Sequence, residues 1–411
     1  MAIPSTATKA QRVTFGDVLA GVSVATVLIP QSLAYAQLAG LPPRLGLVAS
    51  ALPPIIAAPF ASSRYLQIGP SALTSLLALG ALAPLASERS PQFVWLAAVL
   101  AILVGLARML IGALRLGRIT YLMTAPVLMG FTSGAAILIM ASQLPKVFGL
   151  DSVGDRGIFA GLWWTLATPG AWRLTALVLS VLTVVLMLGG RRLYTLFPGA
   201  LLSVLGGTAL ASFGLYDGPV VGKIAGVFPH LPAVGDWGPV PLLIAPAAII
   251  AVVGFAEVSS ISRSFAEEDG TVWNPNQEFL SQGAANVVAG LSGGFPIGGS
   301  FSRSALNRLA GAQTRWSGGI TGLTVLAFLP FAWLLDSLPW AVLGAAVVAG
   351  VVSLIRPRRL LALWYRDRVD AAVAWGTLAA TLLLAPRVER AVVIGIVFAA
   401  LAWLYRRHVE R

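Results

Sequence analysis

The chain has 411 residues, of which 57% are hydrophobic and only 11% are charged. Soluble globular proteins carry roughly 25% charged residues, so this composition excludes an ordinary soluble enzyme or binding module. Cysteine is absent and histidine occurs only as His230 and His408. These counts leave little material for a metal centre or a thiol nucleophile, so we expect no catalytic residues, no metal and no cofactor.

The formal net charge is +12, which in a soluble protein would suggest nucleic acid as a partner. The sequence lacks the Lys and Arg blocks interleaved with aromatic residues that bind bases, so we expect no nucleic-acid binding. In a membrane protein, basic residues gather in the loops that face the cytoplasm, and we interpret the charge in that way.

Apolar runs along the whole chain predict fourteen helical segments. In the first half they span 14–38, 45–60, 70–86, 92–112, 120–142, 172–189 and 195–213. In the second half they span 240–262, 275–291, 302–312, 316–334, 338–355, 369–384 and 389–406. The third and the tenth segments are too short to cross roughly 30 Å of hydrocarbon. The prediction is an all-α polytopic membrane protein that lies in the lipid bilayer.

An even number of spans places both termini on one side of the bilayer. With the N-terminus inside, most of the basic residues fall in cytoplasmic loops, Arg108, Arg191 and Arg359 among them. We therefore predict a multi-pass protein of the inner membrane with both termini in the cytoplasm.

Three polar or aromatic stretches are interpreted as loops. The acidic stretch Glu267–Asp269 and the basic stretch Arg356–Arg359 are predicted to be solvated loop charges. The 143–171 connection, which carries Trp163 and Trp164, is predicted to lie at the membrane interface.

Two similar motifs precede the short segments. Ile68–Leu77 and Ile297–Leu306 each have a Gly/Pro-broken backbone followed by a hydroxyl-rich helix start. A shift of 229 residues (68 to 297) overlays the two halves, and seven helices per half is an odd number. The pattern therefore predicts a seven-plus-seven inverted repeat. The residues Tyr65–Ile68 and Phe295–Ile297 are predicted to pair as two short strands.

Short helices that begin inside the membrane expose unpaired N–H groups and the positive end of the helix dipole. Two such ends that face each other would form an anion-binding site. On the first helix this site would include Ser71 and Ala72. On the second it would include Ser300, Ser302 and Ser304. The alternative is a pair of re-entrant turns with a packing role only.

Charged groups lie close to this pair of motifs in the sequence. Arg303 falls in the first turn of the tenth segment, where it would bind the anion or pair with an internal carboxylate. Glu257 is a carboxylate within the apolar eighth segment, and it would either take up a coupling proton or serve in a structural ion pair. Sodium is the alternative coupling ion, because Ser259, Ser260 and Ser262 supply oxygen ligands nearby.

Two polar residues follow Pro30, which interrupts the first helix. Gln31 and Tyr35 are four residues apart and therefore share a helix face. They would line the anion pocket, or they would form an ordinary hydrogen bond between helices.

Two long motifs carry a family resemblance. The segment Pro30–Pro43 (PQSLAYAQLAGLPP) resembles the first-helix signature of the sulfate permease (SulP) family of anion transporters. The segment Asn276–Ser304, with its NQE start and its GSFSRS end, resembles that family's second signature. The resemblance implies a uracil-permease-like fold and a dimer. It also implies that Gln31 and Tyr35 line the site, and that an acidic residue at Glu257 is associated with cation coupling.

The resemblance also implies two domains that move against each other in an elevator mechanism. The core domain would comprise 14–112 and 240–334, and the gate domain 113–239 and 335–407, after a cytoplasmic N-terminal segment 1–13. Family members usually continue into a cytoplasmic STAS domain. Because this sequence ends at Arg411, no STAS domain is expected in this chain.

The leading hypothesis is a proton-coupled symporter of a small anion of the sulfate, bicarbonate or dicarboxylate class. The alternatives are an uncoupled exchanger or channel, a sodium-coupled bicarbonate symporter and a nucleobase permease. An enzyme is not expected, because the sequence offers no nucleophile–base pair.

Overall fold

The computed structural model describes residues 12–150, 157–194, 196–224 and 227–409, which are predominantly helical. The segment 1–13, expected in the cytoplasm, lies almost wholly outside these residues.

Seven helical stretches in the described part of the chain are long and apolar enough to cross a membrane. They contain the helices α1 (Phe15–Leu38), α4 (Pro91–Ala113), α5 (Ala125–Val147), α10 (Ile244–Glu268), α13 (Trp316–Phe328), α14 (Trp340–Val351) and α17 (Val388–Val409). Three of these stretches include further elements. These are η4 (Val240–Leu243) before α10, η5 (Leu329–Leu335) after α13, and both η6 (Val352–Leu354) and α15 (Pro357–Arg366) after α14.

The remaining helices are shorter. They are α2 (Arg44–Ala57), α3 (Ala72–Leu82), α6 (Ile158–Ala167), α7 (Leu174–Val184), α8 (Gly190–Leu193), α9 (Gly199–Ser212), α11 (Pro275–Leu291), α12 (Phe301–Leu309) and α16 (Arg368–Leu383). The remaining helical elements are the short 3₁₀ turns η1 (Gly117–Leu122) and η2 (Pro169–Ala171) and the π turn η3 (Val185–Gly189). Each of the fourteen predicted segments coincides with a helix.

Two helices lie where the sequence predicted loops. α6 occupies part of the 143–171 connection, and α15 begins at Pro357 within the basic stretch. Proline is well suited to the first position of a helix because its missing N–H would have no intrahelical partner there. The acidic stretch also differs from the prediction. Glu268 ends α10, and both Glu268 and Asp269 form ion pairs with Arg308.

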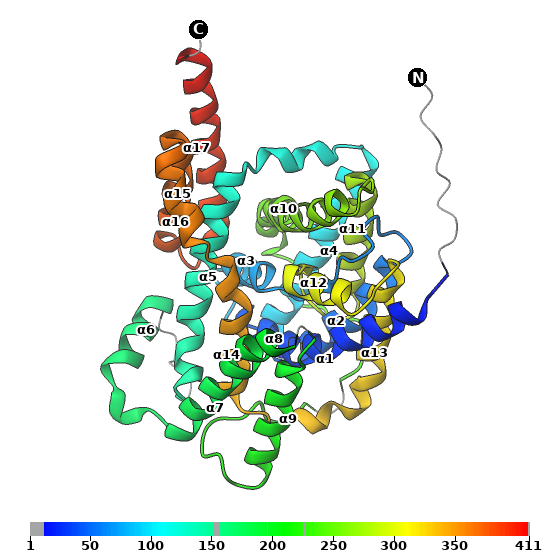
Figure 1. Cartoon of the computed structure of the whole chain (residues 1–411), viewed down its shortest axis with the longest axis vertical. Coiled ribbons are helices and arrows are strands. Elements are labelled where there is room, and N and C mark those ends of the chain that lie inside the picture. Colours follow the sequence, from blue (N-terminus) through cyan, green and yellow to red (C-terminus); the bar gives the residue numbers. More distant parts are fainter. Residues whose placement is uncertain (1–11, 151–156, 195, 225–226, 410–411) are drawn as a thin grey trace.

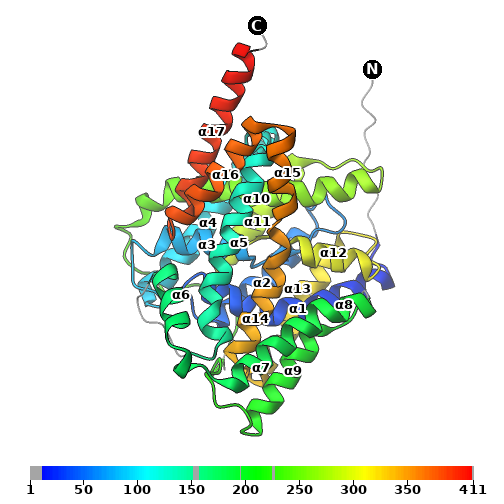
Figure 2. The same ribbon diagram turned by 60° about the vertical axis from the view of Figure 1, so that its left-hand side comes forward.

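The helices form two groups that cross each other. In one group α4 packs along α11, α2 packs along α13, and α1 contacts α12 and α13. In the other group α5 packs against α14 and α16, and α14 packs against α7. Figure 1 shows α1, α10 and α12 running across the view, whereas α5, α9 and α17 run along its long axis, and Figure 2 shows the same helices after a 60° turn.

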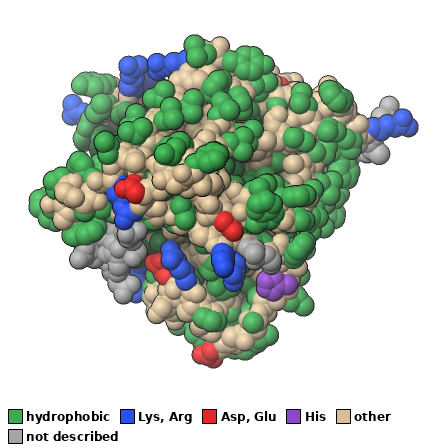
Figure 3. Space-filling model, turned by 90° about the horizontal axis from the view of Figure 1, so that it is seen from below, with side chains coloured by type: hydrophobic (Ala, Val, Ile, Leu, Met, Phe, Trp, Pro, Cys, Tyr) green, Lys and Arg blue, Asp and Glu red, His purple; other side chains and the backbone are tan. Residues whose placement is uncertain are grey.

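The outer surface is rich in apolar side chains. Large hydrophobic residues are exposed along α7, α9 and α17, for example Leu174, Leu205 and Leu401. Figure 3 shows one face on which hydrophobic side chains dominate and charged ones are scattered. Apolar patches of this extent are rare on soluble monomers, so this surface is suited to lipid and the chain is a multi-pass membrane protein.

Asp17 anchors the start of α1. Its carboxylate accepts hydrogen bonds from the backbone N–H groups of Gln313 and Thr314 and from the Thr314 hydroxyl, at 2.8–2.9 Å. It also accepts from the N–H and the hydroxyl of Thr14, the N-cap residue of α1. These bonds join α1 to the connection between α12 and α13, and they satisfy a carboxylate that has no exposed surface.

Candidate anion site

Two short strands meet where α3 and α12 begin. β1 (Ile68–Gly69) and β2 (Gly298–Gly299) pair in antiparallel orientation, with Ile68 opposite Gly299 and Gly69 opposite Gly298. The predicted strands lay earlier, at 65–68 and 295–297. The observed pairing is displaced toward the helices. A β-carbon at Gly298 would lie 3.0 Å from the Thr74 side chain, and one at Gly299 would lie 3.0 Å from those of Leu66 and Val258, so the absence of side chains here makes room for the neighbouring ones.

The pairing follows the sequence repeat. Gly69 pairs with Gly298, which is the residue that the 229-residue shift (69 to 298) assigns to it. The same shift relates Ser71, the N-cap of α3, to Ser300, the N-cap of α12. When equivalent residues of two repeats pair with each other, a local two-fold axis passes between them. α3 and α12 therefore begin on opposite sides of this axis.

The backbone before β2 is held by buried polar side chains. Arg108 of α4 donates to the carbonyl oxygens of Ile297, Ala251 and Ile250 at 3.1–3.4 Å. Asn286 of α11 both donates to and accepts from the backbone of Ile297. Arg108 has no exposed surface, so its assignment to a cytoplasmic loop was wrong. Counting charges along the sequence does not show how deep a residue near a helix end lies.

The backbone before β1 is held in a corresponding way. Glu278 of α11 accepts from the N–H groups of Ser62 and Ser63 at 3.0 and 2.8 Å. Ser304 accepts from the N–H of Gln67 at 2.9 Å, and Asn307 donates to the carbonyl of Tyr65 at 3.1 Å. Ser304 was predicted to bind the anion, but its hydroxyl is engaged with this loop. It does not line the cavity described next.

A small cavity of about 30 Å³ lies between the N-termini of α3 and α12. One water needs roughly 10–15 Å³ by this measure, so the cavity has room for a small polar group. Six of the predicted site residues line it, namely Tyr35, Ser71, Ala72, Glu257, Ser300 and Ser302. The structure thus brings together side chains from α1, α3, α10 and α12.

The two N-cap serines differ in their bonding. The Ser71 hydroxyl accepts from the N–H of Thr74 at 3.4 Å and lies 2.8 Å from the Thr74 hydroxyl. Ser300 makes no capping hydrogen bond, and its hydroxyl lies 3.3 Å from that of Ser302. The first-turn N–H groups of both helices lack intrahelical partners, so the cavity is bordered by donors on two sides.

Arg303 lies in the first turn of α12 and is only 1% exposed. None of its three guanidinium nitrogens has a hydrogen-bond partner within the described ranges. A β-carbon at Gly69 would lie 3.6 Å from Arg303 Nη2, so the guanidinium reaches the β1 strand. No ion pair with Glu257 within 4 Å is present among the described residues, although the two groups interact electrostatically.

Gln31 and Glu257 also carry unused polar atoms. Glu257 lines the cavity, and its Oε2 atom is buried without a hydrogen-bond partner among the described residues. Gln31 Oε1 is in the same condition. A β-carbon at Gly350 would lie 3.7 Å from the Tyr35 hydroxyl and 3.8 Å from Gln31 Nε2, which places this polar face of α1 against α14.

The sequence did not indicate the lining that comes from the other helix group. Gly350 and Val351 at the end of α14, and Ser353 and Leu354 in η6, close the cavity. Gly350 and Ser353, small residues at the end of an apolar run, were the only sequence feature that could have indicated this lining. The sequence alone does not show which helix faces α3 and α12.

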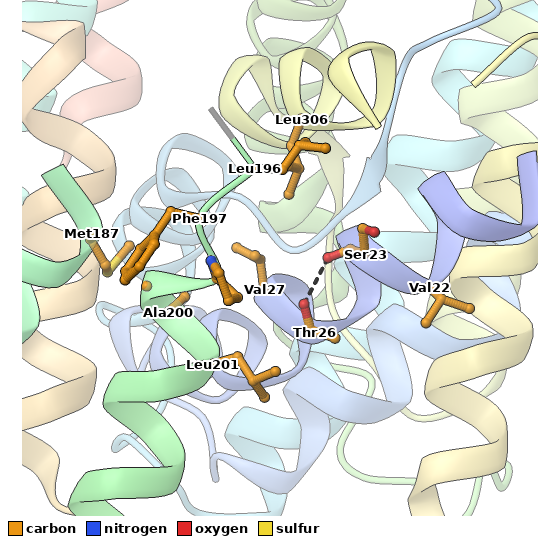
Figure 4. Close-up of a pocket in the computed structure, with 12 residues that line it drawn as sticks. Val22, Ser23, Thr26, Val27, Met187, Leu196, Phe197, Ala200, Leu201 and Leu306 are labelled. Atoms are coloured by element: carbon orange, nitrogen blue, oxygen red, sulfur yellow. Dashed lines mark hydrogen bonds between the residues drawn. The ribbon is translucent and has the colours of Figure 1, made fainter. Parts of the chain in front are cut away.

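Several larger cavities lie elsewhere among the described residues, and two of them adjoin helices of the site. One of about 560 Å³ is lined by the 61–65 and 271–274 loops, the end of α10, and Arg315. The other, of about 200 Å³, lies between α1, the start of α9 and Leu306 of α12 (Figure 4). In Figure 4 the side chains of Val27, Phe197 and Ala200 surround this space, and the Thr26 hydroxyl donates to the Ser23 carbonyl.

A polar network lies beside the larger of these cavities. The Tyr65 hydroxyl donates to Asp269 at 2.7 Å, and Arg308 pairs with Asp269 and Glu268. Burial and the bond to Asp269 raise the pKa of Tyr65, so this hydroxyl stays protonated at neutral pH.

Residues 15–377 match the Sulfate permease family. The chain belongs to the sulfate permease family. The match covers both sequence motifs and all of the residues that line the cavity, so the resemblance drawn from those motifs is confirmed.

Named relatives in this family are transporters rather than enzymes. A probable sulfate transporter of Mycobacterium tuberculosis is 38% identical over 375 residues, which are 89% of this chain and 66% of that protein. Solute carrier family 26 member 6 of Homo sapiens is 32% identical over 95% of this chain and 55% of its own length. The chain therefore spans less than two thirds of these relatives.

Solved structures of related transporters share the fold. Murine Solute Carrier 26 family member A9, described as an anion transporter in the inward-facing state, superposes with a TM-score of 0.85 at 20% identity. The match covers 97% of this chain and 69% of that one. The transmembrane domain of the cyanobacterial bicarbonate transporter BicA gives a TM-score of 0.79 at 22% identity, covering 94% and 98%.

Proposed function

We propose that the protein is a secondary active transporter of a small inorganic or organic anion. The observation that carries this proposal is Arg303, a buried guanidinium whose nitrogens have no hydrogen-bond partners within the described ranges. An unpaired buried charge is costly, and an anion between the two helix N-termini would compensate it. The family relationship supports transport, and relatives described as sulfate and bicarbonate transporters support an oxyanion.

The anion would bind in the cavity between Ser71 and Ser300. First-turn N–H groups of α3 and α12, together with the positive helix ends, would donate to its oxygens. Tyr35 and Ser302 line this cavity, and their hydroxyl groups would complete the coordination of the anion. The amide of Gln31, whose Nε2 would lie 3.8 Å from a β-carbon at the lining residue Gly350, would add a further donor. This arrangement binds negative charge of several shapes, so it is compatible with sulfate, bicarbonate or a dicarboxylate.

Glu257 would couple transport to a proton. Its carboxyl group lines the same cavity and lacks a hydrogen-bond partner for Oε2 in the described structure. A proton on this group would remove the repulsion between the carboxylate and the incoming anion, so both would bind together. Sodium is the less favoured coupling ion, because Ser259 and Ser262 are buried in α10 whereas Ser260 is exposed. The three hydroxyls therefore do not face one common site.

The helix packing supports a division into a core and a gate within a seven-plus-seven inverted repeat. The 229-residue shift carries α2 to α11 and α4 to α13, so the contact of α4 with α11 and the contact of α13 with α2 are equivalent under the repeat. All four helices belong to the proposed core. The cavity lies between the core helices α1, α3, α10 and α12 and the end of α14 in the gate. Movement of the core against the gate, in an elevator mechanism, would carry the anion across the membrane. A homodimer in the inner membrane with cytoplasmic termini completes the proposal.

Uptake by the reconstituted protein tests this function. Proteoliposomes would be loaded at fixed internal pH, and uptake of sulfate, bicarbonate and a dicarboxylate would be measured under imposed proton and sodium gradients. We expect saturable anion uptake that an inward proton gradient accelerates. The Glu257→Gln variant should lose this acceleration, because its amide does not titrate. Wild-type uptake that ignores both gradients would instead indicate an uncoupled exchanger or channel.

A further inference from the structure

α15 differs from the neighbouring helices in its composition. It runs from Pro357 to Arg366 and follows η6 after a two-residue connection. Leu360 is buried, and α15 packs on α16. Figures 1 and 2 show α15 beside α16, at the end of the molecule toward which α17 carries the C-terminus.

The outward side of α15 has an apolar stripe. Leu361, Trp364 and Tyr365 are spaced by three and four residues, so they share one face. Leu361 and Trp364 are about half exposed, and Tyr365 is 91% exposed. Trp and Tyr are the residues that gather at the boundary between lipid tails and water.

A basic stripe lies next to the apolar one. Arg358, Arg359 and Arg366 are exposed, as are Arg356 and Arg368 at the two ends. In the described structure these five arginines form no ion pair. The nearby acidic residues Asp367 and Asp370 both pair with Arg406 of α17, which offsets one of their two negative charges. The five arginines therefore leave this segment with a clear excess of positive charge.

We propose that α15 is an interfacial helix that binds the anionic headgroups of phospholipids. Its apolar stripe would enter the boundary region of the bilayer, and its arginines would contact headgroup phosphates, which guanidinium groups bind in a bidentate manner. A basic amphipathic helix with aromatic residues on the apolar side is the arrangement that binds anionic membrane surfaces.

Headgroup binding by α15 would affect the anion site, because only a short segment connects α15 to the residues that line the cavity. Gly350, Val351, Ser353 and Leu354 line the candidate cavity, and α15 begins at Pro357. An α15 that is held at the membrane surface fixes this end of α14, so the lipid composition regulates transport. This regulatory part rests on the proposed anion-transport function, whereas headgroup binding does not.

A fluorescent label on α15 tests headgroup binding. The chain has no cysteine, so Tyr365→Cys creates a single attachment point for the environment-sensitive dye NBD. The labelled full chain is placed in nanodiscs of phosphatidylcholine alone or with added phosphatidylglycerol. We expect emission at shorter wavelength and higher intensity with phosphatidylglycerol, because the label then lies deeper in the interface.

Charge variants complete the test. The triple variant Arg358→Gln, Arg359→Gln, Arg366→Gln should lose the shift, and the corresponding Lys variant should retain it. Arg387→Gln with Arg390→Gln, at exposed positions before and in α17, is the matched control and should also retain it. An equal response in both lipids, or a normal response of the Gln variant, overturns the proposal.

Uptake in the same lipids tests the regulatory part. We expect phosphatidylglycerol to raise anion uptake by the wild type several-fold and to leave the Gln variant unchanged. A fluorescence shift without any lipid dependence of wild-type uptake overturns the regulation. If the wild type transports no anion in either lipid, the proposed function fails, and the fluorescence result still decides whether α15 binds headgroups.

Discussion

Arg303 combines deep burial with a lack of hydrogen-bond partners in the described part of the chain. A buried charge without a partner carries a desolvation cost, so replacing it by an apolar residue should not destabilise the folded state. Removing one partner of a buried ion pair is instead strongly destabilising, because the other charge is left uncompensated. The two roles of Arg303 considered from the sequence, anion binding and structural ion pairing, therefore predict opposite effects on stability.

The variant Arg303→Met separates these roles. If Arg303 binds the anion, we expect uptake into proteoliposomes to fall by about tenfold or more, since a charged hydrogen bond contributes roughly 1.5–3 kcal/mol. The melting temperature in detergent should not fall. Arg303→Lys keeps the charge but not the bidentate geometry, so its uptake should be intermediate. A lower melting temperature with unchanged uptake kinetics would assign Arg303 a structural role.

The location of a residue near the cavity was predictable where its residue type is unusual for the surrounding sequence. Arg303, Glu257 and the N-cap serines stood out in apolar or Gly-rich surroundings, and the structure places all of them at or beside one cavity. Ser304 and Arg108 were misjudged because their partners are backbone groups of distant segments. Such pairings depend on how the helices pack, which the sequence does not show.

At the scale of elements, the site depends on close packing between helices. α1, which carries Gln31 and Tyr35, contacts α2 at Gly46, where a β-carbon would lie only 1.9 Å from the Ser32 carbonyl oxygen. Gly206 of α9 has no neighbouring atom within 4 Å of the same position. These two helical glycines form a matched pair for a packing test.

Gly46→Ala should separate α1 from α2. We expect a lower melting temperature, because overpacking typically costs about 1–3 kcal/mol, and reduced uptake, because Tyr35 would be displaced. Gly206→Ala should leave uptake unchanged and raise the melting temperature slightly, since alanine is favoured over glycine in helices by up to about 1 kcal/mol. Equal effects of the two substitutions would contradict the close contact at Gly46.

Helices were predictable from apolar runs, and all fourteen predicted segments are helical. Two of the helices that were not expected, α6 and α15, lack a long apolar run. α15 is rich in arginine and begins at a proline, so it resembled a solvated loop. Its apolar residues become visible as a stripe only at helical spacing, with Leu360 buried on one side and Leu361 exposed on the other.

At the scale of the whole molecule, the proposal requires that the core moves against the gate. Val27 of α1 packs against a cluster of Met187, Ala200, Ala346 and Ala349, so Val27 and Ala200 face each other across the proposed boundary (Figure 4). Within the core, a β-carbon at Gly319 would lie 3.1 Å from that of Ala58, which offers a control pair.

Cross-linking in the cysteine-free chain tests this movement. A thiol cross-link in the Val27→Cys, Ala200→Cys variant should stop anion uptake, and a reductant should restore it. The same treatment of Ala58→Cys with Gly319→Cys should leave uptake unaffected, because both residues lie in the core. Full uptake by the cross-linked Val27–Ala200 variant would argue against relative movement of the two domains.

The measurement that tests the central claim most directly is the location of a bound anion by anomalous scattering. Crystals of the wild-type protein would be grown with selenate and, separately, with bromide. The account predicts an anomalous peak between Ser71 and Ser300, within hydrogen-bond distance of the first-turn N–H groups of α3 and α12, and its loss in Arg303→Met. A peak elsewhere, in a protein that transports the same anion, would contradict the assignment of the site.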